Sequence, residues 1–317
     1  MNALTPGLHF IDADTYHSDP CATPSLSSTI AKLLIRQSPM HAWTQSPRLN
    51  PAWEPVNKKT FDIGRAAHGA ILGKGGDYVA IPADLLASNG AASTKAAKDW
   101  IEDARASGLT PLKASEVDQV EAMRIIAVTR LADNGITLDP ARSEVVAIAE
   151  IDGVMCRAMV DNAPVDPSKP LYDLKTCEDA SPEACIRAVM NYGYDVSAAH
   201  YVAVWKAATG EDRAFRFVFQ EKTAPNEICV VELDYDAMMM GKKRIARARD
   251  IWRICTRDDH WPGYPAGVHQ IPLPEFYQSK WLERESVEAD FKKRTGADII
   301  EAATRWQSPE PFRHAGE

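Results

Sequence analysis

The sequence contains no long apolar run. None of its hydrophobic stretches approaches the ~20 residues that a membrane-spanning helix needs. The opening residues, MNALTPGLHFIDAD, include neither a basic nor an apolar segment, so no secretory signal is expected. The six cysteines are scattered and include no CxxC pair, which disfavours a metal–thiolate site and is typical of reduced core residues. These absences predict a cytoplasmic protein that does not contact a membrane.

Positive charge is also in short supply. The formal net charge of −8 argues against a protein that coats nucleic acid over its whole surface. A local basic groove remains compatible with this charge, because the excess of acid can lie on a remote face. The 317 residues, of which 45% are hydrophobic, allow one large domain or two small ones of roughly 100–200 residues each.

Helical patterns occupy much of the chain. Residues 25–43 begin with Ser/Thr capping candidates and keep helical apolar spacing up to Pro39. Small and apolar residues predict a second helix over 61–72, ended by glycines. Further helical patterns are found in 94–133, 181–193, 195–208 and 235–258.

Between these helices the period changes to that of strands. The segment SEVVAIAEIDGVMCRAMVDNA predicts a β-hairpin that turns at Asp152-Gly153. A third strand, KPLYDLKT, follows a proline-containing loop, and AFRFVFQ and EICVVELD predict two more. The order of elements predicts an α/β domain built on a mixed central sheet flanked by helices.

Two carboxylates stand near the ends of neighbouring predicted strands. Asp161 ends the hairpin, and Asp173 shares a strand face with Lys175 because residues i and i+2 point the same way. A surface ion pair is the simplest explanation of Asp173 and Lys175. Two adjacent acids, however, repel each other and favour a bound cation, and Mg²⁺ prefers such oxygen ligands. With a lysine beside them, the pattern suits hydrolysis of a phosphodiester.

The order of several segments resembles one nuclease family. Asp161, a loop, then Asp173-Leu174-Lys175 and a helix resemble the PD-(D/E)XK (restriction-endonuclease-like) core. FDIGRAAHGAIL, GVMCRAMVD, LYDLKT, YGYDVSAAHY, FVFQEKTAPNEICVVELD and WPGYP follow in the order of its RecE-like (exonuclease VIII) phage and prophage branch. The resemblance covers roughly residues 25–275.

The resemblance implies roles for individual residues. His68, Asp161, Asp173 and the backbone carbonyl of Leu174 would bind the metal, and Lys175 would be the catalytic lysine. A Gln-x-x-x-Tyr element of the family matches Ser197 and Tyr201, with serine in place of glutamine.

Three further residues are candidates from their types and positions alone. Arg65 and Arg157 are candidates for phosphate contacts, although most exposed arginines are simply solvated. Glu150, near the hairpin turn, is a candidate acid behind the metal ligands if the strand register turns it inward.

The implied activity is that of a Mg²⁺-dependent exodeoxyribonuclease, with Mn²⁺ as a possible substitute. It would digest one strand of linear double-stranded DNA 5′→3′ in the bacterial host cell and leave 3′ single-stranded tails for recombination. The resemblance also implies a homo-oligomeric ring and a phage single-strand annealing protein as partner. On this basis residues 1–24 form an irregular arm, 25–281 one nuclease domain with its catalytic core at about 140–235, and 282–317 a charged tail.

Two other functions remain open. A structure-specific or restriction-type endonuclease could use the same core. A DNA-binding module without catalytic activity could keep the same fold, although such proteins would be expected to lose the Asp/Lys set first.

Overall fold

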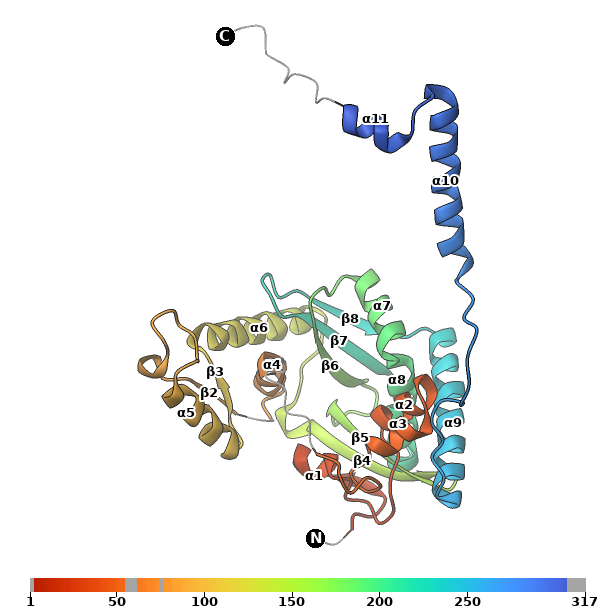
Figure 1. Ribbon diagram of the computed structural model, residues 1–317. Helices are drawn as coiled ribbons and strands as arrows, with labels where there is room; N and C mark the ends of the chain where they lie inside the picture. Colours follow the sequence, from red (N-terminus) through yellow and green to blue (C-terminus); the bar gives the residue numbers. More distant parts are fainter. Residues whose placement is uncertain (1–2, 55–61, 75–76, 307–317) are drawn as a thin grey trace. The chain divides into compact units, whose positions relative to one another are not determined.

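The computed structural model describes residues 3–54, 62–74 and 77–306 (Figure 1). The chain forms two compact units, Met1–Tyr264 and Pro265–Glu317. The division expected from the sequence, with a nuclease domain that ends at residue 281, stays a prediction. No helix in the described part of the chain is both long and apolar enough to span a lipid bilayer.

A six-stranded sheet forms the centre of the first unit. Its strand order is β1-β4-β5-β6-β7-β8, and every neighbouring pair is antiparallel except β6 and β7. The mixed sheet with flanking helices confirms the predicted fold class. The strands are β1 (Gly7–His9), β4 (Ser143–Ile151), β5 (Val154–Asn162), β6 (Leu171–Cys177), β7 (Phe215–Glu221) and β8 (Ile228–Glu232).

The helices of this unit lie on both faces of the sheet and beside it. Residues 1–24, which were expected to be irregular, contribute β1 and a short helix. A small parallel pair, β2 (Tyr78–Ala80) and β3 (Thr110–Leu112), forms a second sheet. The helices are α1 (Ala13–His17), α2 (Ser28–Arg36), α3 (Pro39–Thr44), α4 (Asp62–Leu72), α5 (Lys95–Ala106), α6 (Ala114–Asp133), α7 (Pro182–Tyr192), α8 (Tyr194–Thr209) and α9 (Tyr235–Asp258).

The hairpin turn sets the register of the sheet. Asp152 and Gly153 both have positive φ, 53° and 73°, which is the geometry of a two-residue hairpin turn. Ile151 therefore faces Val154, and the pairing continues in step to Ser143 opposite Asn162. The parallel pair β6 and β7 needs a crossover connection, and α7 and α8 supply it.

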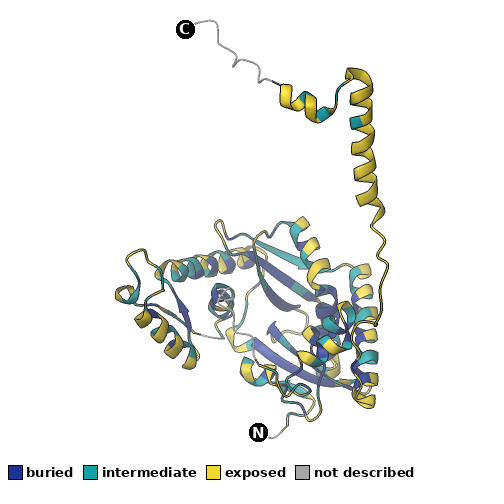
Figure 2. Cartoon of the chain, in the orientation of Figure 1, coloured by how far each residue is buried: buried dark blue, intermediate teal, exposed yellow. Residues whose placement is uncertain are grey.

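Each face of the sheet packs against its own hydrophobic core, and the strands are the most buried part of the unit (Figure 2). On one face, Leu171 and Phe217 pack with residues of α2, α8 and α9. On the other face, Tyr172 and Leu174 pack with residues of α4 and α6. Asp173 and Lys175, which alternate with Tyr172 and Leu174, therefore belong to the face that α2 and α8 cover.

The contact between α8 and α9 depends on Gly241. A Cβ at this position would lie 2.3 Å from the carbonyl oxygen of Asp195 and 3.1 Å from the Cβ of Ala199. The missing side chain lets the two helix backbones meet, and beside this point Arg244 binds the Asp195 carboxylate through bonds of 2.7 and 2.8 Å.

We therefore expect Gly241→Ala to lower the free energy of unfolding by about 1–3 kcal/mol, the usual cost of overpacking. Helix propensity alone would make the alanine variant more stable than wild type by up to about 1 kcal/mol. Propensity and overpacking therefore have opposite effects on stability. Chemical denaturation of wild type and variant measures the difference. A variant as stable as wild type would contradict the close approach of α8 and α9.

The second unit is helical. It contains α10 (Glu275–Thr295) and α11 (Ile299–Arg305), and neither helix has a buried residue. Gly296, in the left-handed conformation with φ 70°, ends α10.

Candidate active site

Asp161 and Asp173 lie where two strands of the central sheet separate. β5 and β6 pair at a single position, Asn162 opposite Tyr172. Beyond this point the side chain of Asp161 replaces the missing ladder bond, because its Oδ2 accepts a hydrogen bond of 2.6 Å from the backbone N–H of Leu174. Both carboxylates are buried, Asp173 almost completely. The divergence of the strands thus holds two acids together in a largely apolar surrounding.

Lys175 is the cation nearest to this pair. Its ammonium group contacts Oδ1 of Asp173, its neighbour on the same strand face. The side chain of Lys175 is 26% exposed, whereas that of Asp173 is 1% exposed, so the amine connects a buried acid with solvent. The Nζ atom also lies 5.4 Å from the centre of the Tyr194 ring at the start of α8.

His68 brings a third group to the carboxylates from α4. Its Nε2 lies 3.1 Å from Oδ2 of Asp161, and its side chain is 27% exposed. Small residues allow this approach: Ala66 and Ala67 are fully buried, and a Cβ on Gly64 would lie 3.0 Å from the Oγ1 of Thr176 in β6. The helix that was predicted from its small residues is therefore pressed against the strand that carries Asp173.

Glu144 is an acid of the site that the sequence analysis missed. It lies in β4 between Ser143, which faces Asn162, and Val145, which faces Val160, at a position where the ladder is interrupted and φ is 52°. It is buried, and its charge contributes to raising the pKa of His68. The signal was present in the sequence. A two-residue turn at Asp152-Gly153 pairs Ile151 with Val154, and counting back along the hairpin brings Glu144 level with Asp161, although these two residues are not themselves paired in the ladder.

The same register corrects the expectation for Glu150. It faces Met155 beside the hairpin turn and is exposed. Six residues separate it from Glu144, which corresponds to about 20 Å of strand. Glu150 therefore lies at the opposite end of the hairpin from Asp161.

Arg157 does not face the site either, contrary to the expected phosphate contact. Its side chain is 4% exposed and lies 3.2 Å from the Asp19 carboxylate, with hydrogen bonds of 2.8 and 2.6 Å to the carbonyl and hydroxyl of Ser25. The guanidinium also packs over the Tyr16 ring, 5.4 Å from its centre. Arg157 thus joins the N-terminal segment to β5. Arg65, on α4, is exposed and remains a candidate for phosphate contacts.

Tyr201 and Ser197 both lie on α8. Tyr201 is partly buried, with its ring edge-on to Phe215 at 5.6 Å between centres. Burial raises the pKa of Tyr201 well above its usual value, and the charges of Asp173 and Asp161 raise it further. Ser197 is buried within the same helix.

Electrostatics distinguishes the two aspartates. Burial raises the pKa of Asp173 to about 6; Lys175 opposes this change and the charge of Asp161 adds to it. Burial has the same effect on Asp161, but the nearby His68 outweighs it and lowers the pKa of Asp161 to about 2. Burial disfavours the charged form of His68, yet the Asp161 carboxylate outweighs burial and raises the pKa of His68. The site thus stabilises positive charge, and a cation beside Asp173 would favour its ionised form.

The donors present fit a hard divalent cation. Oδ2 of Asp173 is buried and has no hydrogen-bond partner among the described residues, which is costly unless some group satisfies it. Within the described ranges no group of three or more His, Cys, Asp or Glu side chains is arranged so that it could hold a metal ion. Instead, Lys175 places its ammonium group against Asp173, and the Asp161 carboxylate favours the charged form of His68 by raising its pKa. Carboxylate, imidazole and carbonyl oxygen or nitrogen donors of this kind are ligands that Mg²⁺ or Mn²⁺ accepts.

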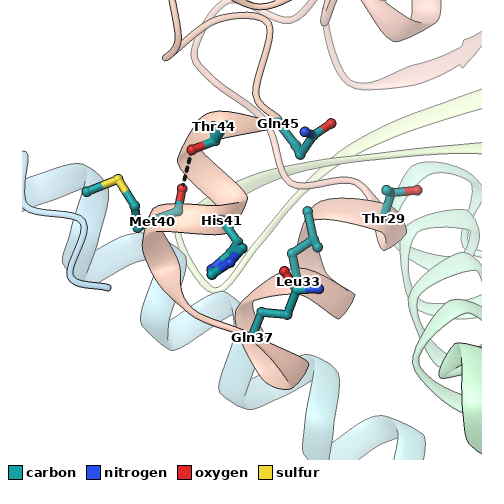
Figure 3. A pocket seen from close by; sticks show the side chains of 7 residues that line it. All are labelled: Thr29, Leu33, Gln37, Met40, His41, Thr44 and Gln45. Carbon is teal, nitrogen blue, oxygen red and sulfur yellow. Dashed lines mark hydrogen bonds between the residues drawn. The ribbon is translucent and has the colours of Figure 1, made fainter. Parts of the chain in front are cut away.

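A groove elsewhere on the unit has no part in this site. It has a volume of about 430 Å³ and lies between α2 and α3, beside Leu33, Gln37, Met40 and His41 (Figure 3). The hydroxyl of Thr44 donates to the Met40 carbonyl at 2.8 Å, so this hydroxyl is satisfied within α3. The groove contains none of the acids or basic residues described above.

Comparison with solved structures supports the fold. The chain resembles the structure called "Putative exonuclease" from Eubacterium rectale, with a TM-score of 0.56 and 14% identity, over 84% of this chain and 97% of that one. At this identity the likeness shows the fold alone. A phage related exonuclease from Haemophilus somnus (TM-score 0.30, 14% identity, 61% of this chain and 95% of that one) is more distant. So is an alkaline exonuclease from Laribacter hongkongensis (TM-score 0.25, 12% identity, 64% and 98%). No curated protein matches the sequence.

The sequence matches one family model over most of the chain. Residues 27–271 match the family described as a PDDEXK-like domain of unknown function, DUF3799. This range contains the central sheet from β4 to β8, His68 on α4 and both aspartates together with Lys175. The chain therefore belongs to the PDDEXK-like DUF3799 family.

Proposed function

We propose that this protein is a metal-dependent exodeoxyribonuclease that hydrolyses linear double-stranded DNA. The observation that carries the proposal is the buried Asp173, with one carboxylate oxygen on the Lys175 ammonium and the other without a partner in the described part of the chain. Asp161 acts on it from close by, and His68 lies 3.1 Å from Asp161, within a PDDEXK-like domain. A surface ion pair would not bury its acid to 1% exposure.

We assign the ligands of the ion to Asp161, Asp173, His68 and the carbonyl of Leu174. Glu144 is a further acid near His68. Mg²⁺, or Mn²⁺ in its place, supplies a Lewis acid that activates water and stabilises negative charge on the phosphate. Lys175 contributes its own positive charge at the opening of the site, where it can orient the attacking water and stabilise the pentacovalent phosphate. The Tyr194 ring, 5.4 Å from the ammonium, attracts this positive charge through a cation–π contact.

The finer details of the proposal rest on the resemblance to the RecE-like branch. We place the chain in that branch and propose 5′→3′ digestion that leaves 3′ single-stranded tails for recombination. The name of the Eubacterium rectale structure agrees with an exonuclease. A homo-oligomeric ring and a phage single-strand annealing protein as partner belong to the same proposal. A ring would reconcile the net charge of −8 with a basic central channel.

A nuclease assay on matched substrates tests this function. Linear duplex labelled at the 5′ or 3′ end is compared with the same sequence as a closed circle, in Mg²⁺, in Mn²⁺ and in EDTA. We expect loss of linear duplex from its 5′ ends with either metal, no cutting of the circle and no activity in EDTA.

Each rival function has its own outcome in this assay. Cutting of the closed circle would replace the exonuclease by an endonuclease. Release of no nucleotide with either metal, together with retained binding of the duplex in EDTA, would replace the enzyme by a DNA-binding module.

A further inference from the structure

A second lysine lies beside the catalytic one. Lys32, on α2, has its Nζ atom 5.5 Å from the centre of the Tyr194 ring, and the Nζ of Lys175 lies 5.4 Å from the same centre. Two ammonium groups from elements far apart in the sequence thus share one aromatic ring. Arg36 follows Lys32 by one helical turn and lies on the same side of α2.

The geometry of this pair is built into the helix junction. Gly193 joins α7 to α8 with φ 65°, a conformation that favours glycine. A Cβ at this position would lie 3.4 Å from Cδ of Lys32 and 3.6 Å from Cδ of Arg36, so both aliphatic stems pack against the glycine. The opposite side of α2 is anchored by its buried residues Ile30, Ala31 and Leu34. The two cationic ends are therefore directed by packing rather than free on a surface.

Neither cation is neutralised locally. In the described part of the chain, no carboxylate oxygen lies within 4.0 Å of the charged groups of Lys32 or Arg36. Burial lowers the pKa of Lys32 to about 8, and the positive charge of Lys175 lowers it further despite the opposing effect of Asp173. Asp173 and Asp195 offset part of the repulsion between these like charges, and a bound anion would offset more of it.

We propose that Lys32 and Arg36 bind a phosphate of the DNA strand being digested, next to the phosphate held at Lys175. This inference rests on the proposed nuclease function and adds a substrate subsite to it. Lys32 would contact the phosphate as a point charge, and the planar guanidinium of Arg36 would donate two hydrogen bonds to its oxygens. Such contacts set the register of the strand without reading its sequence.

The test measures DNA binding apart from cleavage. The dissociation constant of a linear duplex is measured in EDTA over a range of salt concentrations for wild type, Lys32→Gln and Arg36→Gln. Each lost phosphate contact should reduce the slope of log K against log salt by about 0.9. In Mg²⁺ we expect kcat/KM to fall at least tenfold in both variants, mostly through KM, and Lys32→Arg to restore binding.

Lys98→Gln is the matched control, because it removes one exposed positive charge on α5. It should leave the slope and kcat/KM as in wild type, and thermal melting should be equal for all variants. If Lys32→Gln and Arg36→Gln keep the wild-type slope and KM while wild type digests DNA, the subsite is refuted and the nuclease stands. If wild type binds DNA without digesting it and both variants lower the slope, the phosphate site stands and the nuclease is refuted.

Discussion

Replacing Asp173 by Asn, or Lys175 by Gln, is expected to reduce nucleotide release from linear duplex DNA by on the order of 10³-fold, the usual effect of losing one preorganised charged group at a reacting centre. The Asp173→Asn substitution keeps the shape of the buried side chain but removes the charge that holds the metal. The Lys175→Gln substitution keeps much of the length of the lysine but removes the ammonium that contacts Asp173 Oδ1. A steady-state assay with end-labelled duplex in Mg²⁺ measures both effects.

Two further measurements separate chemistry from folding. Binding of Mn²⁺, followed by calorimetry, should weaken in Asp173→Asn and persist in Lys175→Gln, because only the aspartate is assigned as a ligand. Glu150→Gln is the matched control, since this exposed acid lies at the far end of the hairpin and should leave activity unchanged. Full activity in both site variants would refute the assignment of the active site.

Arg157→Ala is expected to lower the free energy of unfolding by about 3–5 kcal/mol, the cost of removing one partner from a buried ion pair. The Asp19 carboxylate is only 1% exposed in its side chain and would lose the guanidinium that lies 3.2 Å from it. The carbonyl and hydroxyl of Ser25 would also lose their donors. Chemical denaturation monitored by circular dichroism measures the loss.

The arginine that was expected to contact DNA is thus predicted to act on stability. Arg65→Ala, at an exposed position on α4, should change stability by no more than about 0.5 kcal/mol. The double variant Asp19→Ala/Arg157→Ala should lose less unfolding free energy than the two single variants lose in total, because it leaves no unpaired buried charge. Arg157→Ala with wild-type stability and weakened DNA binding would restore the original expectation.

The central sheet and its hairpin could be predicted because their signals are local. Asp152-Gly153 adopts the positive φ angles of the predicted turn, and Gly193 and Gly210, both in the left-handed conformation, end α7 and α8 close to the predicted helix ends. The short strand Gly7–His9 was not predicted, because three residues carry no readable alternation. Its place in the sheet comes from antiparallel pairing with β4.

The residues of the candidate site likewise divide into those that the sequence reveals and those that only tertiary contacts bring together. Asp161, Asp173 and Lys175 were identified from their order along the chain, and their proximity follows from neighbouring strands. Glu144 was within reach of the same reasoning, because the turn sets the register. Lys32 was not, because nothing in α2 indicates that it packs over a glycine far along the chain, at the junction of α7 and α8.

The sequence by itself determined the order of elements, the hairpin register and the Asp/Lys set, since these depend on backbone preferences and alternation over a few residues. Only the tertiary structure decided which charged residues serve the site and which hold the fold. It buried Arg157 against Asp19, left Glu150 in solvent and brought Lys32 to Tyr194. The physical reason is that the burial and pairing of a charge depend on contacts between segments far apart in the chain, which no local pattern encodes.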